Sequence, residues 1–203
     1  LSLSSGIPEE RMRAVNGCKR NIDYAASMGC GIIIGFLKGG PGSDREVSER
    51  LFLESMLELK PYIEEKKVQV LIEATNHKEA SIIRTLKEGA HVINFLDCPF
   101  IQLLADTYHM NIEEPSLVDS LSEYMSYYPH LHISDDNRAY PGLGSLDFTA
   151  IYRKLMECGY KGTVAVEGNI QHGLLEDTQI CAAYLHKVCS GLHTPSRVPS
   201  HAV

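Results

Sequence analysis

Four residues with metal-binding side chains each stand at or next to the end of a short hydrophobic run: Glu73, Asp106, His132 and Glu167. Taken singly, such an acid often caps the following helix, and a lone histidine in a strand is usually a core residue. Four at equivalent positions favour one shared site, because parallel strands end at the same edge of a sheet. Three carboxylates and one imidazole suit Mn²⁺, Mg²⁺ or Co²⁺ with open positions better than a closed thiolate zinc site, and Zn²⁺ is a further candidate.

A divalent ion held by these side chains could polarise a carbonyl and a neighbouring hydroxyl, and so lower the cost of an enediolate-like intermediate. Two of the four candidates, Glu73 and Glu167, are glutamates on strands well separated in the sequence. On opposite faces of a substrate, one could remove a proton from carbon while the other returns one. The pattern therefore predicts the chemistry of an epimerase or an aldose–ketose isomerase.

The elements that must position these residues alternate strictly between strand and helix, which indicates an α/β fold with a parallel sheet. Strands are predicted at residues 1–4, 31–37, 68–74, 101–106, 130–133 and 163–167. Helices are predicted from Pro8 to Gly29, after Ser43, and at 80–90, 118–127, 148–158 and 175–189. Six such units fall short of the eight in a TIM (β/α)8-type barrel. We interpret residues 1–190 as a single barrel domain that lacks its first two units at the N-terminus, and residues 191–203 as a flexible C-terminal tail.

The segments between these elements carry local signals. The glycine loop from Lys38 to Asp44 lacks the ending of a phosphate-binding loop, so Ser43 and Glu46 are predicted to form a capping box instead. Residues 108–114 are predicted to be an exit loop, and residues 76–79 to lead into the next helix. Asp147 is predicted to cap the helix that starts at residue 148.

Composition excludes several classes of protein. The formal charge of −7 and the pI near 5.7 argue against nucleic acid as a partner, since no stripe of lysine and arginine could neutralise phosphates. No apolar run approaches the roughly 20 residues of a membrane span, and the first residues do not resemble a signal peptide. The six cysteines are scattered without a C-x-x-C pair. Reduced thiols and a cytoplasmic location are therefore expected.

Several motifs also carry a family resemblance. The segments Ile72-Glu-Ala-Thr-Asn-His-Lys-Glu79, Asp106-Thr-Tyr-His-Met-Asn111 and His130-Leu-His-Ile-Ser-Asp-Asp-Asn-Arg138, with Val166-Glu167, resemble the sugar isomerase/epimerase family of xylose-isomerase-like barrels. The similarity is greatest to the D-tagatose 3-epimerase branch and runs in order over roughly residues 1–190.

The resemblance implies metal ligation by Glu73, Asp106, His132 and Glu167, with the two glutamates as the acid/base pair. It also implies that His109, Arg138 and Glu79 contact the substrate, which would be a sugar or a sugar phosphate. Each of these three has a simpler interpretation: a loop cap, a surface ion pair and a helix N-terminal acid, respectively. Family members are often dimers or tetramers, so a homo-oligomer is expected.

The sequence departs from the D-tagatose 3-epimerase pattern at His77, where an arginine is common. A divalent-metal-dependent ketose 3-epimerase is the favoured function. Enzymes similar to hydroxypyruvate isomerase, sugar-phosphate epimerases or inosose dehydratase share the scaffold and remain alternatives. A DNA-repair endonuclease is disfavoured because it would need a histidine-rich zinc site. A non-catalytic sugar-binding barrel is disfavoured because it would not need both glutamates.

Overall fold

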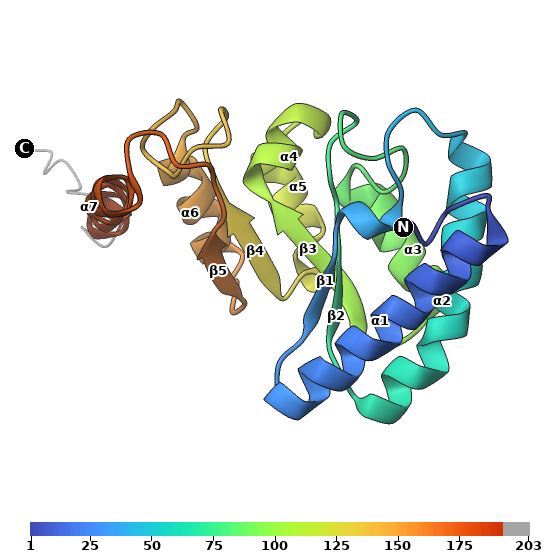
Figure 1. Cartoon of the computed structure of the whole chain (residues 1–203). Coiled ribbons are helices and arrows are strands. Elements are labelled where there is room, and N and C mark those ends of the chain that lie inside the picture. Colours follow the sequence, from blue (N-terminus) through green and yellow to red (C-terminus); the bar gives the residue numbers. More distant parts are fainter. Residues whose placement is uncertain (193–203) are drawn as a thin grey trace, which may run out of the picture.

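Five parallel strands form one sheet in the order β1-β2-β3-β4-β5 in the computed structural model, which describes residues 1–192 of the 203-residue chain. The strands are β1 (Ile32–Ile34), β2 (Val70–Glu73), β3 (Ile101–Asp106), β4 (His130–Ile133) and β5 (Thr163–Val166). Every neighbouring pair is parallel. The sheet with its helices is a half-barrel of the TIM type (Figure 1). The predicted α/β class is confirmed.

The helices lie along the outside of this sheet, with α1 and α2 side by side and α7 beside α6 (Figure 1). They are α1 (Pro8–Met28), α2 (Arg45–Lys66), α3 (Leu86–Leu96), α4 (Thr107–Glu113), α5 (Leu117–Glu123), α6 (Phe148–Glu157) and α7 (Leu174–Leu192), with the short 3₁₀ helices η1 (Phe36–Lys38) and η2 (Met125–Tyr127). None of the described helices combines the length and the apolar character that crossing a membrane requires.

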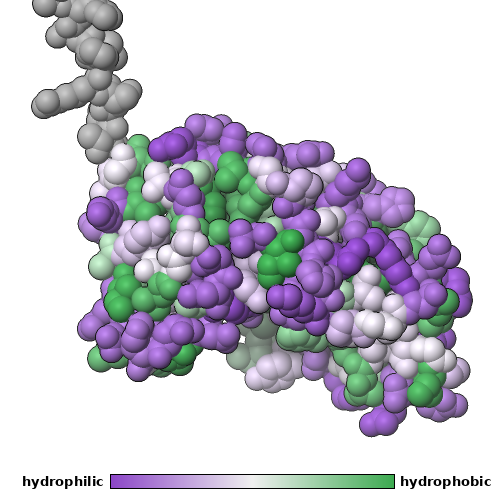
Figure 2. Space-filling model, turned by 90° about the horizontal axis from the view of Figure 1, so that it is seen from above, coloured by the Kyte–Doolittle hydropathy of each residue, from purple (hydrophilic) through white to green (hydrophobic). Residues whose placement is uncertain are grey.

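The hydrophobic core fills the space between the sheet and these helices. Its largest fully buried side chains include Tyr128, Phe52, Phe148 and Ile72. The outer strand β5 is much more exposed than β2, and its Val164 and Val166 are 38% and 40% exposed. Seen from above, the surface is mainly hydrophilic, with hydrophobic residues in small groups (Figure 2).

The prediction of a strand at residues 1–4 is wrong. Leu3 is fully buried and donates one backbone hydrogen bond to Leu37 O at 2.8 Å, but Ser2 accepts from Ser4 N through its side chain and turns the chain. Serine hydroxyls compete with strand ladders in this way. The described chain therefore has five strands rather than six.

One helix prediction and one loop prediction are also wrong, because local capping decided the boundaries. The helix predicted at 80–90 begins only at Leu86, where Thr85 accepts from Glu88 N, and residues 76–85 form a loop. The segment 108–114, predicted as a loop, lies almost entirely in helix α4, which Asp106 caps by accepting from the amides of Tyr108 and His109.

The remaining boundaries need smaller corrections. The N-cap of α2 is Asp44, which accepts from Val47 N at 2.9 Å, so the predicted capping box at Ser43 is not formed. The helix predicted at 118–127 ends at Glu123 and continues as η2. The predicted cap at Asp147 is confirmed by its bond from Ala150 N at 2.9 Å. Of the predicted tail, residues 191 and 192 end helix α7, and residues 193–203 lie outside the described part of the chain.

Candidate metal centre

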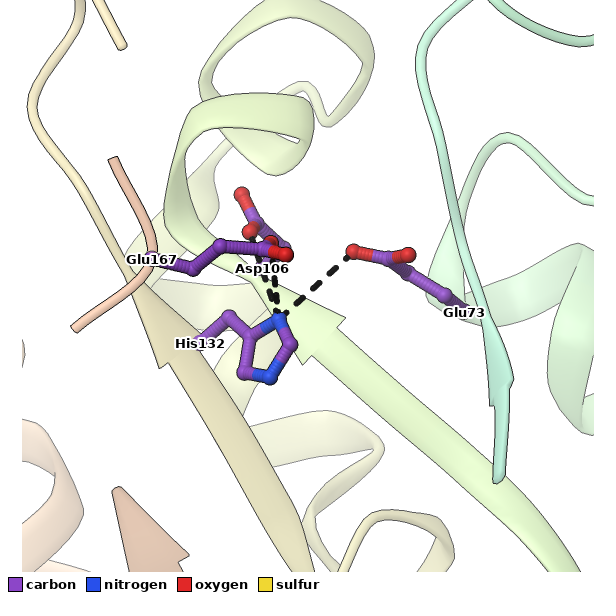
Figure 3. Close-up of side chains that lie close together, drawn as sticks. All are labelled: Glu73, Asp106, His132 and Glu167. Carbon is purple, nitrogen blue, oxygen red and sulfur yellow. Dashed lines mark hydrogen bonds and ion pairs between the residues drawn. The ribbon is translucent and has the colours of Figure 1, made fainter. Parts of the chain in front are cut away.

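The four candidate ligands meet at the carboxyl edge of the sheet. Glu73 and Asp106 are the last residues of β2 and β3, His132 is the third of four residues in β4, and Glu167 directly follows β5. One ligand atom from each lies within 4.8 Å of the other three (Figure 3). Parallel pairing explains the convergence, because Asp106 is in register with His132, and Glu167 N donates to Ile133 O.

The imidazole of His132 lies at the centre of this group. Its Nδ1 is 2.9 Å from Glu167 Oε2, 3.8 Å from Glu73 Oε1 and 3.9 Å from Asp106 Oδ2 (Figure 3). Glu73 and Glu167 approach the histidine from opposite sides in this view. The sequence therefore placed all four residues in one site, although it could not give their distances.

One atom of the group has no internal partner. Glu73 Oε1 is buried and accepts no hydrogen bond; only two other side-chain atoms in the described residues are in this condition. The opposite oxygen, Oε2, lies against Gly35, where an added Cβ would come within 2.7 Å. A buried carboxylate oxygen without a donor is costly unless a cation satisfies it. Together with the hard donor set, this orphaned oxygen fits a divalent cation.

Charges in the group are strongly coupled. Burial raises the pKa of Asp106 to about 6, although Arg138 opposes the shift. The hydrogen bond from His132 lowers the pKa of Glu167 to about 2. Burial disfavours a charged His132, but its hydrogen bond to Glu167 and the nearby carboxylate of Glu73 outweigh burial and raise its pKa to about 9. A cation at this place would replace the proton of His132, since an imidazole must be neutral to ligate.

Arg138 binds two of the candidate ligands through its guanidinium group. Its Nη1 donates to Asp106 Oδ1 and Oδ2 at 2.8 and 2.7 Å, and its Nη2 donates to Glu167 Oε2 at 2.8 Å. The guanidinium also stacks 5.0 Å from the ring centre of Tyr108. The backbone of Arg138 has a φ of 63°. The loop that follows β4 is held by the fully buried Asp135, which accepts hydrogen bonds from Gly142 N and Leu146 N. Because Asp106 is fully buried, the ion pair between Arg138 and Asp106 is not a surface pair.

His109 lies next to Glu73, and its imidazole is neutral. The backbone amide of Asn76 donates to His109 Nδ1 at 3.3 Å, so Nε2 carries the proton. That Nε2 is 3.8 Å from both Glu73 Oε1 and Glu79 Oε2. Burial lowers the pKa of His109 to about 3, and the charge of Arg138 adds to the effect. His109, Glu79 and Arg138 thus lie around the four candidate ligands, and their contact with a substrate stays a prediction.

Two further residues at this edge were missed from the sequence. Asn76 is fully buried and orients His109, and Lys38 is fully buried and donates to Thr75 Oγ1 at 2.5 Å. Both directly follow or lie near the ends of predicted strands, and a polar residue there is the signal that could have identified them. His77, by contrast, is half exposed and bonds Glu113 away from the ligands.

The chain belongs to the xylose isomerase-like TIM barrel family, whose model matches residues 1–183. Its relatives include the 3-dehydro-D-guloside 4-epimerase of Escherichia coli K12, 37% identical over 102 residues, which are 50% of this chain and 39% of that protein. The D-psicose 3-epimerase of Ruminiclostridium cellulolyticum is 33% identical over 121 residues, which are 60% of this chain and 41% of that protein.

The solved structures agree with this assignment. The D-psicose 3-epimerase of Clostridium cellulolyticum H10, determined with D-tagatose, superposes with a TM-score of 0.83 at 25% identity and covers 95% of this chain and 75% of that one. The matched part of the curated relatives named above is about two fifths of their length.

Proposed function

We propose that the chain is part of a divalent-metal-dependent sugar epimerase, with ketose 3-epimerisation as the favoured reaction. The observation that carries this proposal is the placement of two glutamates, Glu73 and Glu167, on opposite sides of His132 within one group of four ligands (Figure 3). Relatives that bear the names of ketose 3-epimerases support the choice.

In this proposal Glu73, Asp106, His132 and Glu167 would hold the ion, with Mn²⁺ as the first candidate and Mg²⁺, Co²⁺ or Zn²⁺ as others. The ion would supply Lewis acidity toward the oxygens of a bound ketose. One glutamate removes the proton from the carbon next to the carbonyl, and the electron pair of the broken C–H bond moves toward the carbonyl oxygen. The other glutamate, protonated at the start, delivers its proton to the opposite face of the same carbon.

The surrounding residues have distinct parts in this scheme. His109 donates from Nε2 to a substrate oxygen, because burial keeps the imidazole neutral and Asn76 fixes its tautomer. Glu79 accepts from a substrate hydroxyl next to it. Arg138 orients the carboxylates of Asp106 and Glu167 and can bind a substrate hydroxyl through its remaining donors.

A 4-epimerase is the second candidate, because the 3-dehydro-D-guloside 4-epimerase of E. coli is 37% identical over its matched part. Removal of a proton next to a ketone is common to both reactions, so the same two glutamates would serve. A homo-oligomer is part of the proposal because of the family resemblance, and a cytoplasmic location because the scattered cysteines are expected to be reduced.

Solvent exchange tests the proposed function. The protein is loaded with Mn²⁺ and incubated in D₂O with free ketoses, phosphorylated ketoses and 3-keto sugars, and the products are followed by NMR. Deuterium at C3 with a new epimer is the expected result, and deuterium at C4 of a 3-keto sugar would select the 4-epimerase. Glu167→Gln should slow exchange by about 10²-fold or more, since it removes one proton carrier. Exchange at neither carbon by a protein with stoichiometric Mn²⁺ would overturn the proposal.

A further inference from the structure

A fully buried lysine lies near the β2 side of the candidate metal centre. Lys38 ends η1, which follows β1, and its side chain has no exposed surface. Its Nζ donates to Thr75 Oγ1 at 2.5 Å and lies 3.4 Å from Gly35 O, and none of the ion pairs found in residues 1–192 includes it. Burial lowers the pKa of Lys38 to about 8. An ammonium without a paired carboxylate is expensive to bury, so its retention calls for a reason other than stability.

The surroundings of Lys38 connect it to the β2 side of the site. Its partner Thr75 is two residues beyond Glu73, and its second partner, Gly35, packs against Glu73 Oε2. The two carboxylates whose charges act on Lys38 are Glu73 and Glu79. Both of them face His109 Nε2 at 3.8 Å. The lysine therefore lies beside two of the acids at the candidate site.

The charges at the site show what an additional cation would do. With the second glutamate protonated, as the proposed reaction requires, three of the four carboxylates of Glu73, Glu79, Asp106 and Glu167 are charged, and a divalent ion and Arg138 together carry three positive charges. The site would then be neutral as a whole without Lys38, and the lysine makes it positive. A net positive charge favours the negative charge that develops on a substrate oxygen when the proton leaves.

We propose that Lys38 is a positioning residue for the reaction, acting from beside Glu73 and Glu79 as a fixed counter-charge that favours proton abstraction by Glu167, because negative charge then moves from Glu167 to a substrate oxygen nearer the lysine. This inference rests on the proposed function. A sugar without a charge interacts only weakly with the positive charge of Lys38 before the proton leaves. Substitution of Lys38 should therefore change kcat rather than KM. The same charge repels a metal cation, so Lys38 weakens metal binding while it assists turnover.

The test is Lys38→Met, which keeps the length of the side chain and removes its charge. Lys60→Met is the matched control, because Lys60 also donates to two groups, the carbonyls of Leu96 and Asp97, but does so on the opposite edge of the sheet. Three quantities are measured for each protein: the melting temperature without metal, the dissociation constant of Mn²⁺ by calorimetry, and kcat and KM of the exchange reaction.

For Lys38→Met we expect a melting temperature that is unchanged or higher, Mn²⁺ binding that is several-fold tighter, and a kcat that is about tenfold lower or more at a similar KM. Lys60→Met should leave kcat and Mn²⁺ binding unchanged. A lower melting temperature together with weaker Mn²⁺ binding in Lys38→Met would show a structural role and overturn the inference, as would a wild-type kcat.

Lys38→Gln separates the charge from the hydrogen bond to Thr75, since glutamine can still donate but is neutral. It should lose as much kcat as Lys38→Met, and recovery by glutamine would overturn the assignment to charge. The melting and Mn²⁺ measurements need no substrate. If wild-type protein exchanges no sugar, the proposed function fails, while tighter Mn²⁺ binding by Lys38→Met without loss of stability still supports a fixed charge near Glu73.

Discussion

The side chain of Asp106 makes two kinds of interaction in the structure, and substitutions can distinguish them. Its Oδ1 accepts from the amides of Tyr108 and His109 and so caps α4, whereas its charge pairs with Arg138 and belongs to the candidate ligand group. Asparagine keeps an oxygen for the cap but removes the charge. Alanine removes both. The pair Asp106→Asn and Asp106→Ala therefore tests whether this strand-terminal acid is more than a helix cap.

The expected magnitudes follow from these contacts. Either variant removes one of the two ion-pair partners of Arg138, whose side chain is 19% exposed and keeps its bond to Glu167. The unfolding free energy without metal should therefore fall by only about 1–2 kcal/mol. Alanine should lose about 1 kcal/mol more through the missing cap. In wild-type protein, Mn²⁺ at about 100 times its dissociation constant should add about 2.7 kcal/mol, and both variants should lose most of that gain.

Thermal unfolding with Mn²⁺ and with a chelator measures all of these differences, since 1 kcal/mol corresponds to about 2–4 °C for a domain of this size. Asp147→Ala is the control, because Asp147 caps α6 in the same way but is no member of the ligand group. It should lose stability and keep the full Mn²⁺ shift. If Asp106→Asn also keeps the full shift, the ligand assignment is refuted, and equal stability of the two Asp106 variants would refute the cap.

Two further predictions follow from neighbouring residues. Gly35→Ala should weaken Mn²⁺ binding by about tenfold, because the new Cβ would lie 2.7 Å from Glu73 Oε2 and displace that carboxylate. Gly40→Ala is the control and should not weaken binding, because no atom lies within 4 Å of its added Cβ. Equal Mn²⁺ affinities of the two variants, measured by calorimetry, would contradict this prediction. The unfolding free energy of wild-type protein relative to Lys38→Met should rise between about pH 8 and 10.5, by up to about 3 kcal/mol, because in this window the unfolded chain holds a proton on Lys38 that the folded protein has lost. Urea unfolding at several pH values measures the difference, and a constant or falling difference would show that the lysine is not held in a desolvated place.

The agreement between sequence and structure is best where one local signal was sufficient. The mainly apolar runs at 68–74 and 101–106 predicted β2 and β3, and the alternation of Leu131 and Ile133 with two histidines predicted β4. The carboxyl-edge position of the ligands followed from parallel pairing alone. The boundaries failed where side chains competed for backbone amides, as at Thr85, which caps α3 six residues later than predicted.

The amino-acid sequence by itself determined the parallel α/β class, the edge of the sheet where the candidate ligands lie and the four residues that could hold an ion. These depend on periodicity and on residue type at strand ends, which are local properties. Only the tertiary structure decided that Arg138 bridges Asp106 and Glu167, that Asn76 fixes the tautomer of His109 and that Lys38 is buried near Glu73. Those contacts join residues about 30 or more positions apart, and their energies depend on burial, which the order of residues does not reveal.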